Sequence, residues 1–378
     1  MKFVIAPDSF KGSLSAEQAA NAMATGIRRV FPTAEYTLVP MADGGEGTVA
    51  ALVAATGGHL VSAAVHDPLD RPIMASYGLL GTSNTAVIEM AAASGLQFVD
   101  PQTQSPLQAS TYGTGELIKA AVARGVDRII IGLGGSATVD GGAGMAQALG
   151  VHLLDSAGQE LPHGGGALTR LARIDLRDLD PRLNQVAILL AADVTNPLTG
   201  PTGAARVFGP QKGATPAMVI TLEQGLAQLA AVVKRDCGRA PSQEPGAGAA
   251  GGLGFGLLAF THARLKRGID LVLQFTNFAQ QVAGADYVFT GEGQVDFQTQ
   301  FGKTPLGVSR AARQVVPGVP VIALAGSLGR GVERLYGDFT AIFATPSGAK
   351  DLQQAIADAP ADVALTAENV ARLIKGLK

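Results

Sequence analysis

Acidic, amide and hydroxyl side chains gather in five short segments of this chain, at residues 7–13, 41–48, 134–142, 192–197 and 291–296, and all but the fourth contain glycine. Carboxylates can accept a hydroxyl proton or hold a cation, whereas glycine-rich backbone presents N–H groups to anions. One such segment would be an ordinary turn, because Gly, Asp and Asn are common between strands and helices. Their recurrence in five segments instead favours the rim of an active site.

A short apolar run precedes each segment, and such runs alternate with helical patterns along the chain. The predicted strands are residues 3–6, 36–39, 86–90, 128–133, 186–191, 287–290, 321–325 and 341–344. This alternation is typical of parallel sheets flanked by helices, and continuous apolarity indicates strands buried on both faces. We therefore predict an α/β fold whose ligands bind beyond the carboxyl ends of the strands.

Several helix boundaries are readable from their capping residues. Ser15 and Gln18 form a capping box, and Thr215 and Thr304 each precede a proline suited to the first helical position. Gly238 is placed to end the helix that follows Thr215. Residues 366–368 are predicted to open the last helix.

Composition excludes several classes of protein. The 29 basic and 31 acidic residues give a net charge of −2, which disfavours nucleic-acid binding. No apolar run approaches the roughly 18 residues of a membrane span, and the start of the chain lacks a signal-peptide pattern. A single cysteine, Cys237, fits a reducing compartment, so a cytoplasmic protein is expected. The length of 378 residues predicts two domains.

The segment at residues 134–142 is the best candidate for binding phosphate. Glycines there precede a helical pattern at residues 143–149, and N–H groups at a helix start favour anions. A P-loop is absent, because Phe297 stands where the first glycine before Gly302-Lys303-Thr304 is required. The glycine-rich residues 244–252 are compatible with either a flexible linker or a loop that opens a helix.

Phosphoryl transfer requires cations on the phosphates, a carboxylate for the hydroxyl proton and usually Mg²⁺. The segments and their neighbours supply Lys11, Lys212 and Lys303 as cations and Asp8, Asp43, Asp193, Glu292 and Asp296 as carboxylates. Asp193 follows a strongly apolar strand and precedes Thr195-Asn196-Pro197, so a buried, oriented carboxylate there could act as a base. The five histidines lack metal-ligand spacing, and no G-x-S-x-G motif occurs, which disfavours zinc chemistry and a hydrolase elbow.

Two other readings compete with phosphoryl transfer. Residues 132–137 read G-x-G-x-x-A, and Asp155 follows near the spacing of about 20 residues expected of a ribose-binding acid. A dinucleotide-dependent dehydrogenase would not, however, require the other acidic segments. A non-catalytic ligand-binding protein is the third reading, since no single motif dominates.

The chain resembles the bacterial glycerate kinase family, which includes glycerate 2-kinase. The matching segments are residues 6–15, 40–48, 132–138 with 140–145, 193–198, 207–214, 246–256 and 291–294 with 302–305. The resemblance implies ATP and D-glycerate as substrates, phosphoglycerate as product with the 2-isomer favoured, and Mg²⁺ as the metal. It also implies two α/β domains with the site in the cleft between them. The expected domains are residues 1–75 with 285–378, and an inserted domain at residues 76–284.

The resulting hypothesis also assigns roles to individual residues. Asp193, Lys11 and Lys212 are expected to be catalytic, with Asp193 as the base. The residues expected to bind substrate or nucleotide are Asp8, Ser9, Asp43, Gly134, Gly135, Ser136, Asn196, Gly248, Gly251, Glu292 and Lys303, which makes residues 246–252 a site loop. The candidate metal ligands are Asp43, Asp193, Glu292 and Asp296.

Overall fold

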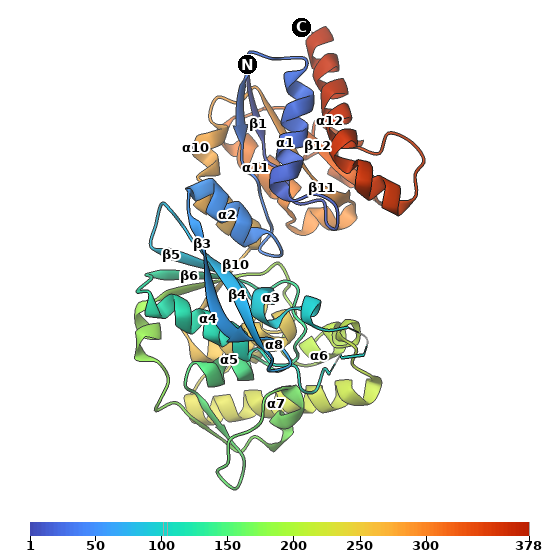
Figure 1. The fold of residues 1–378 in the computed structure, drawn as a ribbon. Helices are drawn as coiled ribbons and strands as arrows, with labels where there is room; N and C mark the ends of the chain where they lie inside the picture. Colours follow the sequence, from blue (N-terminus) through green and yellow to red (C-terminus); the bar gives the residue numbers. More distant parts are fainter. Residues whose placement is uncertain (101, 104, 378) are drawn as a thin grey trace. The chain divides into compact units, whose positions relative to one another are not determined.

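The computed structural model describes residues 1–100, 102–103 and 105–377, and Figure 1 shows its ribbon. The chain forms two compact units. Unit 1 contains Met1–Asp43, Ala50–Thr56 and Arg267–Lys378, of which Lys378 itself lies outside the described residues. Unit 2 contains Gly44–Val49 and Gly57–Lys266. Each unit is an α/β fold of mainly parallel strands flanked by helices, as the sequence predicts.

Unit 1 is built on a five-stranded sheet in which every pairing is parallel. Its order is β13 (Ala341–Ala344), β12 (Val321–Leu328), β11 (Tyr287–Val295), β1 (Lys2–Ile5) and β2 (Glu35–Leu38). The chain leaves β1 toward β2 on one side, and it leaves β11 toward β12 and β13 on the other. The direction of winding therefore reverses between β1 and β11, the position where open parallel sheets bind ligands.

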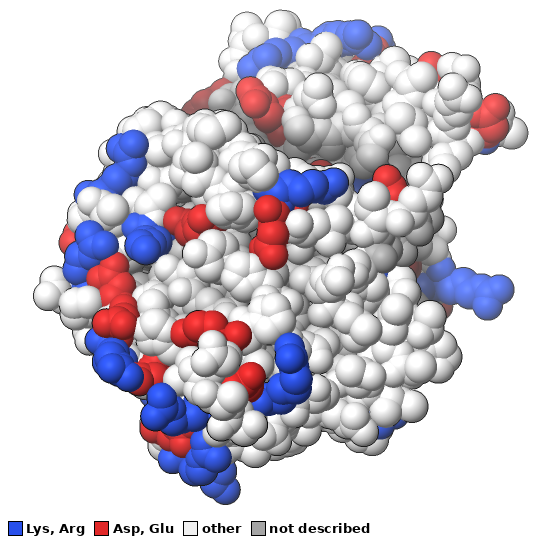
Figure 2. All heavy atoms as spheres, turned by 60° about the horizontal axis from the view of Figure 1, so that its bottom comes forward, with Lys and Arg blue, Asp and Glu red and all other residues white. Residues whose placement is uncertain are grey.

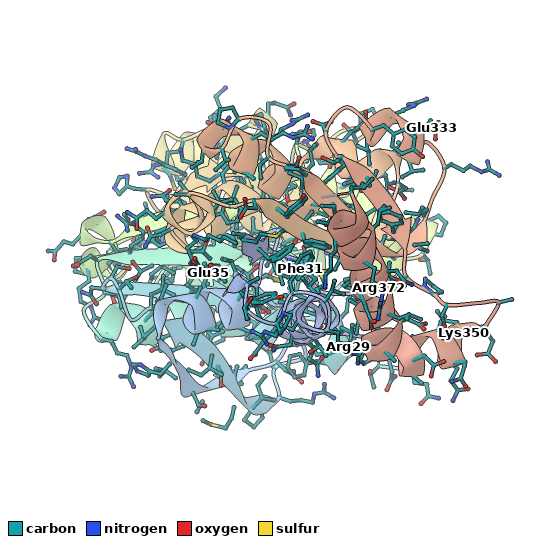
Figure 3. The ribbon with its side chains drawn as sticks, turned by 90° about the horizontal axis from the view of Figure 1, so that it is seen from above. Arg29, Phe31, Glu35, Glu333, Lys350 and Arg372 are labelled. Atoms are coloured by element: carbon teal, nitrogen blue, oxygen red, sulfur yellow. The ribbon has the colours of Figure 1, made fainter. Side chains whose placement is uncertain are left out.

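Helices α1 (Ala16–Arg28) and α12 (Leu352–Gly376) lie side by side on one face of this sheet (Figure 1). Their apolar residues, among them Met23 and Val363, pack on Phe3, Ile5 and Phe289 of the strands. At one end of the pair, Glu368 accepts hydrogen bonds from Arg29 at 3.0 Å and from Arg372 at 2.7 Å, and Figure 3 shows these two arginines on neighbouring helices. Helices α9 (Gly268–Phe275), α10 (Phe278–Val282) and α11 (Thr304–Val315) complete unit 1.

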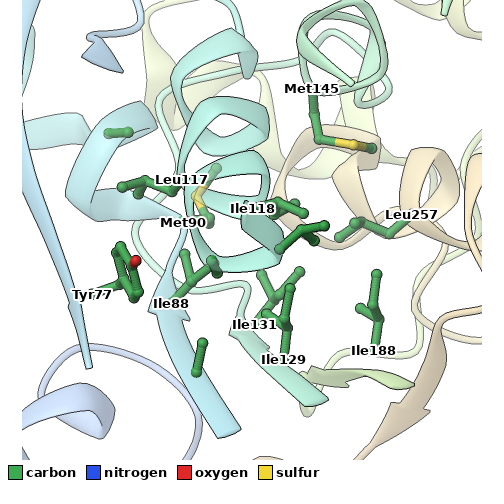
Figure 4. Close-up of a cluster of buried hydrophobic side chains, with 14 of the residues drawn as sticks. Tyr77, Ile88, Met90, Leu117, Ile118, Ile129, Ile131, Met145, Ile188 and Leu257 are labelled. Carbon is green, nitrogen blue, oxygen red and sulfur yellow. The ribbon is translucent and has the colours of Figure 1, made fainter. Parts of the chain in front are cut away.

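Unit 2 contains a six-stranded sheet in the order β10 (Arg264–Lys266), β9 (Ala187–Ala191), β6 (Arg128–Gly132), β5 (Thr85–Glu89), β4 (Pro72–Leu79) and β3 (His59–His66). Strands β5, β6, β9 and β10 pair in parallel, whereas β3 and β4 form an antiparallel hairpin on β5. Its core is aliphatic. Figure 4 shows Ile88, Ile129, Ile131 and Ile188 from the strands beneath Ile118 of α4 (Tyr112–Ala123).

Further elements accompany the sheet of unit 2 along the chain. They are α2 (Thr48–Thr56), which spans the boundary with unit 1, α3 (Ala91–Ser94), α5 (Ala143–Ala148), α6 (Ala204–Phe208), α7 (Pro216–Cys237), α8 (Ala249–Phe260) and a separate hairpin of β7 (His152–Leu154) with β8 (Arg173–Asp175). By length and composition alone, α7 is the one helix of the described residues that could cross a membrane, which the sequence analysis did not anticipate. Leu222, Leu226, Leu229 and Val233 of this helix are nevertheless buried in the core of unit 2, so its apolar face serves packing.

The boundaries of the units differ from those expected from the sequence, 75/76 and 284/285. Residues 57–75 belong to unit 2, because the hairpin of β3 and β4 hydrogen-bonds to β5. Residues 267–284 belong to unit 1, where α9 and α10 pack against α11. Period-two exposure and small residues such as Ser62 and Ala64 make β3 weak as a sequence signal.

The helix caps follow the sequence in two cases of four. Ser15 and Gln18 form the predicted capping box, and α7 has Thr215 as N-cap and Gly238 in the left-handed conformation at its end. In contrast, α11 has Lys303 as N-cap, so Thr304 is its first residue. The last helix begins at Leu352 behind the Asp351 cap rather than at residue 366, and it continues through Pro360.

On the face drawn in Figure 2, the described Lys and Arg side chains are interspersed with Asp and Glu. Several form close pairs within unit 2, including Arg177 with Asp175 and Arg182 with Asp180. This face therefore carries no continuous basic stripe among its described residues.

The contact between α1 and α12 yields a test of the packing of unit 1. A Cβ atom at Gly26 would lie 2.0 Å from the carbonyl oxygen of Ala364, a backbone atom that cannot rotate away. Gly26→Ala should therefore lower the free energy of unfolding by about 2 kcal/mol, the middle of the range for overpacking. The matched control is Gly376→Ala in α12, where a Cβ meets nothing within 4 Å. Urea unfolding measures both, and equal stabilities would contradict the close helix contact.

Candidate active site

Asp8 lies at the reversal point of the unit 1 sheet, three residues after the end of β1. Its side chain is 8% exposed, and its Oδ1 accepts a hydrogen bond from the Ser9 N–H at 2.6 Å. Its Oδ2 accepts a hydrogen bond from the Thr304 hydroxyl at 2.5 Å. The first residue of α11 is thus hydrogen-bonded to the loop after β1.

Glu292 and Lys303 form an ion pair in the same unit. Glu292 extends from β11, where its Oε2 lies 3.3 Å from the Lys303 Nζ and its Oε1 accepts the Thr299 hydroxyl at 2.9 Å. Burial raises the pKa of Glu292, while Lys303 and Thr299 oppose that rise. Lys303 and Thr304 therefore contact carboxylates in this structure, and Gly302-Lys303-Thr304 does not form a P-loop.

Burial and nearby negative charge raise the pKa of Asp8. Burial is the largest cause and the Asp43 charge the next, with a smaller effect of Glu292, and together they raise the pKa of Asp8 to about 7. The hydrogen bonds from Thr304 and Ser9 oppose the rise. A carboxyl that titrates near neutrality can take up a proton from a substrate hydroxyl.

The other predicted residues of unit 1 have different environments. Asp296 caps the short helix η6 (Phe297–Phe301), and its carboxylate accepts the Gln298 N–H at 2.8 Å and the Gln294 amide at 2.9 Å. This candidate metal ligand therefore already has structural partners. Lys11 is exposed in the turn that follows Asp8, and a Cβ at Gly293 would lie 3.2 Å from its backbone nitrogen.

Lys212 is the central cation of unit 2. It ends the short helix η4 (Pro210–Lys212), is only 3% exposed, and donates to the Ser136 hydroxyl and to the Thr138 carbonyl, both at 2.6 Å. Burial lowers the pKa of Lys212 to about 7, while the Asp140 carboxylate opposes that shift. Lys212 thus stabilises the loop that follows β6 through two hydrogen bonds.

The helix start behind this loop, which the sequence analysis predicted to bind phosphate, is occupied by a carboxylate of the protein. Asp140 accepts the N–H groups of Gly142 at 3.0 Å and Gly144 at 3.2 Å, so the protein's own carboxylate satisfies the start of α5. The N–H groups of Gly134, Gly135 and Ser136 donate no hydrogen bond to any described residue. Gly134 and Gly135 are exposed, and these three amides are the remaining candidates for binding an anion.

The glycine-rich residues 246–252 are a packed loop that opens α8 and not a flexible linker. A Cβ at Gly251 would lie 1.9 Å from the Thr138 carbonyl oxygen, and one at Gly248 would lie 2.3 Å from that of Pro197. The Gly248 N–H donates to the Asn196 carbonyl at 2.8 Å. Gly248 and Gly251 are both buried, so they hold the neighbouring loops together at distances that only glycine permits.

Asp193 has a different environment from the one predicted for it. The sequence analysis expected a buried, oriented carboxylate, but Asp193 is exposed, because the chain leaves the sheet at Ala191. Asn196 is half-buried and donates its side-chain amide to the Thr202 carbonyl at 2.8 Å. Exposure leaves Asp193 without the desolvation that tunes a buried base.

Sequence reasoning did not single out Asp140, Thr304 or Glu89 for the roles they have here. Glu89, at the end of β5, accepts the Val49 N–H at 2.8 Å at the start of α2, and burial raises its pKa. Glu89 could have been identified from the sequence as a single acid at the carboxyl end of an apolar strand. A Cβ at Gly134 would lie 3.0 Å from the Gly45 Cα, so residues 44–49 also lie beside the loop after β6.

The structure thus brings the predicted residues together in two groups. Unit 1 holds Asp8, Ser9, Lys11, Asp43, Glu292, Asp296 and Lys303, a group in which carboxylates predominate. Unit 2 holds Gly134, Gly135, Ser136, Asp193, Asn196, Lys212, Gly248 and Gly251, a group of backbone amides with a buried cation.

The dinucleotide-binding alternative does not fit this geometry. Asp155 follows β7, which pairs only with β8 among the described strands and is not part of the six-stranded sheet. The Asp155 carboxylate accepts the N–H groups of Ala157 and Gln159, at 2.8 and 3.0 Å, and so forms a tight turn. The ribose-binding acid of a dinucleotide fold instead follows a strand of the parallel sheet.

Two α/β units, one with clustered carboxylates and one with an amide loop over a buried lysine, make up an α/β protein with groups suited to binding anions and cations. Comparison with known proteins then specifies the family. The model of the glycerate kinase family matches residues 3–375, and this chain belongs to that family. A glycerate kinase of Bacillus subtilis is 51% identical over 99% of this chain and 98% of its own, and the glycerate 2-kinase of Escherichia coli is 47% identical over 98% and 97%. A crystal structure assigned as glycerate kinase 2 from Salmonella typhimurium LT2 superposes with a TM-score of 0.90 at 48% identity, covering 100% of this chain and 98% of that one.

The raised pKa of Asp8 predicts how the stability of the ligand-free protein depends on pH. Between pH 4 and 7 the folded Asp8 binds a proton that the unfolded chain releases, so its contribution to stability falls as the pH rises through this range. Asp8→Asn should therefore raise the melting temperature at pH 8, where the buried charge costs at most about 4 kcal/mol. The gain should be small at pH 5, where Asp8 is already protonated. A gain equal at both values, measured by calorimetry, would show that the Asp8 charge is not destabilising.

Proposed function

We propose that this protein transfers the γ-phosphoryl group of ATP to D-glycerate and releases phosphoglycerate and ADP. The observation that carries the proposal is the near-full-length identity, about half of all positions, to relatives that bear the name glycerate kinase. The chemistry of the two residue groups supports it. Phosphoryl transfer depends on positioning and on charge neutralisation more than on covalent catalysis.

The loop after β6 fits the anionic parts of these substrates. The three free N–H groups of residues 134–136 and the buried ammonium of Lys212 can oppose the negative charge of a phosphate or of the glycerate carboxylate. Lys11, which is exposed, and Lys303, which is paired with Glu292, are further cations for the nucleotide phosphates. Gly248, Gly251 and Asn196 support the loop through packing.

Two carboxylates are candidates for the base that accepts the hydroxyl proton. Asp193 is the candidate from the sequence analysis, but it is exposed. Asp8 is buried, is held by Ser9 and Thr304, and titrates near neutrality, which are the properties expected of a general base. We therefore favour Asp8 for this role.

Mg²⁺ is the metal that ATP chemistry implies, and the oxygen ligands of unit 1 fit it in part. No group of three His, Cys, Asp or Glu side chains among the described residues forms a ready cation cage. Mg²⁺ is usually held by one or two carboxylates together with substrate phosphates and water, so a complete cage is not required. Asp43 and Glu292 would hold the ion, which would neutralise charge on the phosphate oxygens. Asp296, with its carboxylate already engaged, is the weaker candidate.

The position of phosphorylation can be read directly from the product. We infer the 2-hydroxyl, on the strength of the Escherichia coli relative, which is named glycerate 2-kinase. Incubation with ATP and D-glycerate should release ADP in a coupled assay, and proton-coupled phosphorus NMR should show a doublet. A phosphate on the secondary 2-hydroxyl couples to one proton, whereas a phosphate on the primary 3-hydroxyl couples to two and gives a triplet. A triplet would assign the 3-hydroxyl, and absence of ADP release would leave a non-catalytic binding protein as the better reading.

Two variants distinguish the candidate bases. Asp8→Asn should lower kcat by about 100-fold or more, the range expected for a lost general base. Asp193→Asn should then lower kcat by less than about tenfold, because that carboxylate acts outside the proton transfer. The control is Asp155→Asn, which alters the tight turn after β7 and touches neither candidate base. If Asp193→Asn shows the larger loss, the base is Asp193, as the sequence analysis predicted.

A further inference from the structure

Asp140 is a fully buried carboxylate that the proposed reaction does not use. It accepts four hydrogen bonds: from the Thr111 N–H and hydroxyl, both at 2.8 Å, and from the Gly142 and Gly144 N–H groups. The Thr111 hydroxyl in turn accepts the Met145 N–H at 2.9 Å. Thr111 and Asp140 together thus satisfy the backbone at the start of α5.

The hydrogen-bond partners of Asp140 are those of a carboxylate, and they oppose the rise in pKa that its burial causes. All four of its partners are donors, so the NH₂ group of an amide in this place would face an N–H or O–H. Negative charge is also favoured at a helix start. The carboxylate therefore occupies the position that a bound phosphate takes in other glycine loops.

Lys212 connects this carboxylate to the loop that carries the free amides. Its Nζ donates to Ser136 and Thr138, which are the fourth and second residues before Asp140. Asp140 is the charged group that supports the buried ammonium against the loss of its water. Loss of the carboxylate would therefore affect both the start of α5 and the lysine that holds residues 136–138.

We propose that Asp140 is a positioning residue: it fills the helix-start anion site with the protein's own charge, and through Thr111 and Lys212 it holds residues 134–136 open to the substrate anion. This inference rests on the proposed function, and it assigns the anion to the loop amides rather than to α5. The ligand class is a carboxylate or phosphate group. Separate KM values for D-glycerate and ATP show whether the bound anion is the glycerate carboxylate or an ATP phosphate.

The test compares Asp140→Asn with the wild-type enzyme. Hydrogen exchange should show at least tenfold faster exchange of the Gly142 and Gly144 amides. The KM for one substrate should rise at least tenfold, and kcat should fall by a smaller factor. Inorganic phosphate is the probe of the anion site, and its stabilising effect on the wild type should weaken as Lys212 loses its proton near pH 7. In Asp140→Asn this midpoint should move to lower pH, because the ammonium has lost its supporting charge.

A matched pair and a control keep the result interpretable. Thr111→Val removes the hydroxyl that bridges Asp140 to Met145, whereas Thr111→Ser keeps it, so the first should reproduce the KM effect and the second should not. These variants carry the test if Asp140→Asn fails to fold. Asp236→Asn, which removes a partly buried carboxylate bound to the Ile174 N–H, should lose stability without a KM change.

The outcomes separate this inference from the proposed function. If the wild type does not phosphorylate glycerate, the proposed function fails, while the exchange and phosphate-titration measurements still test Asp140. If Asp140→Asn exchanges faster but keeps its KM values, its phosphate affinity and the midpoint of its pH dependence, the positioning role is overturned and Asp140 is only a helix cap. The same conclusion follows if Asp236→Asn changes KM as much as Asp140→Asn does.

Discussion

The close approach of glycine-rich backbones is the constraint on which the unit 2 site depends. Residues 246–252 lie so near residues 138–142 that a single methyl group at Gly251 would overlap the Thr138 carbonyl. Most polar groups buried by such contact need a partner within the protein, and the Thr138 hydroxyl is an exception with none among the described residues. The burial of Lys212 and its two hydrogen bonds follow from this requirement, as does the fourfold coordination of Asp140.

Unit 1 concentrates charge for a different reason. Parallel strands deliver their carboxyl ends to one edge, and the reversal between β1 and β11 places Asp8 and Glu292 there together. Their mutual repulsion is offset by Lys303 on Glu292 and by the Thr304 hydroxyl on Asp8, both from the start of α11. The loops of unit 2 are thus shaped by packing, whereas the loops of unit 1 are shaped by a balance of charges.

The sequence was sufficient for features that depend on local pattern and insufficient for those that depend on tertiary contacts. The eight predicted strands are all present, because continuous apolarity marks a strand buried on both faces. The acidic segments were recognisable because they follow those strands. No local signal, however, showed that Asp140 rather than a ligand would occupy the start of α5, since that depends on Thr111, 29 residues earlier. Burial of Asp8 and exposure of Asp193 likewise depend on which loops cover them. The hairpin of β3 and β4 was missed, because only its pairing with β5 makes it part of the unit 2 sheet.

The two buried groups with near-neutral pKa values, Asp8 and Lys212, respond to ligands in opposite ways. In the ligand-free protein, burial favours the neutral form of each. An anion bound near Lys212 favours its ammonium form, and a cation entering the carboxylate group favours ionised Asp8. Binding would therefore increase the charged fraction of each group, with proton uptake at Lys212 and proton release at Asp8. Burial that costs stability in the free protein thus makes the charge of each group depend on the ligand it serves.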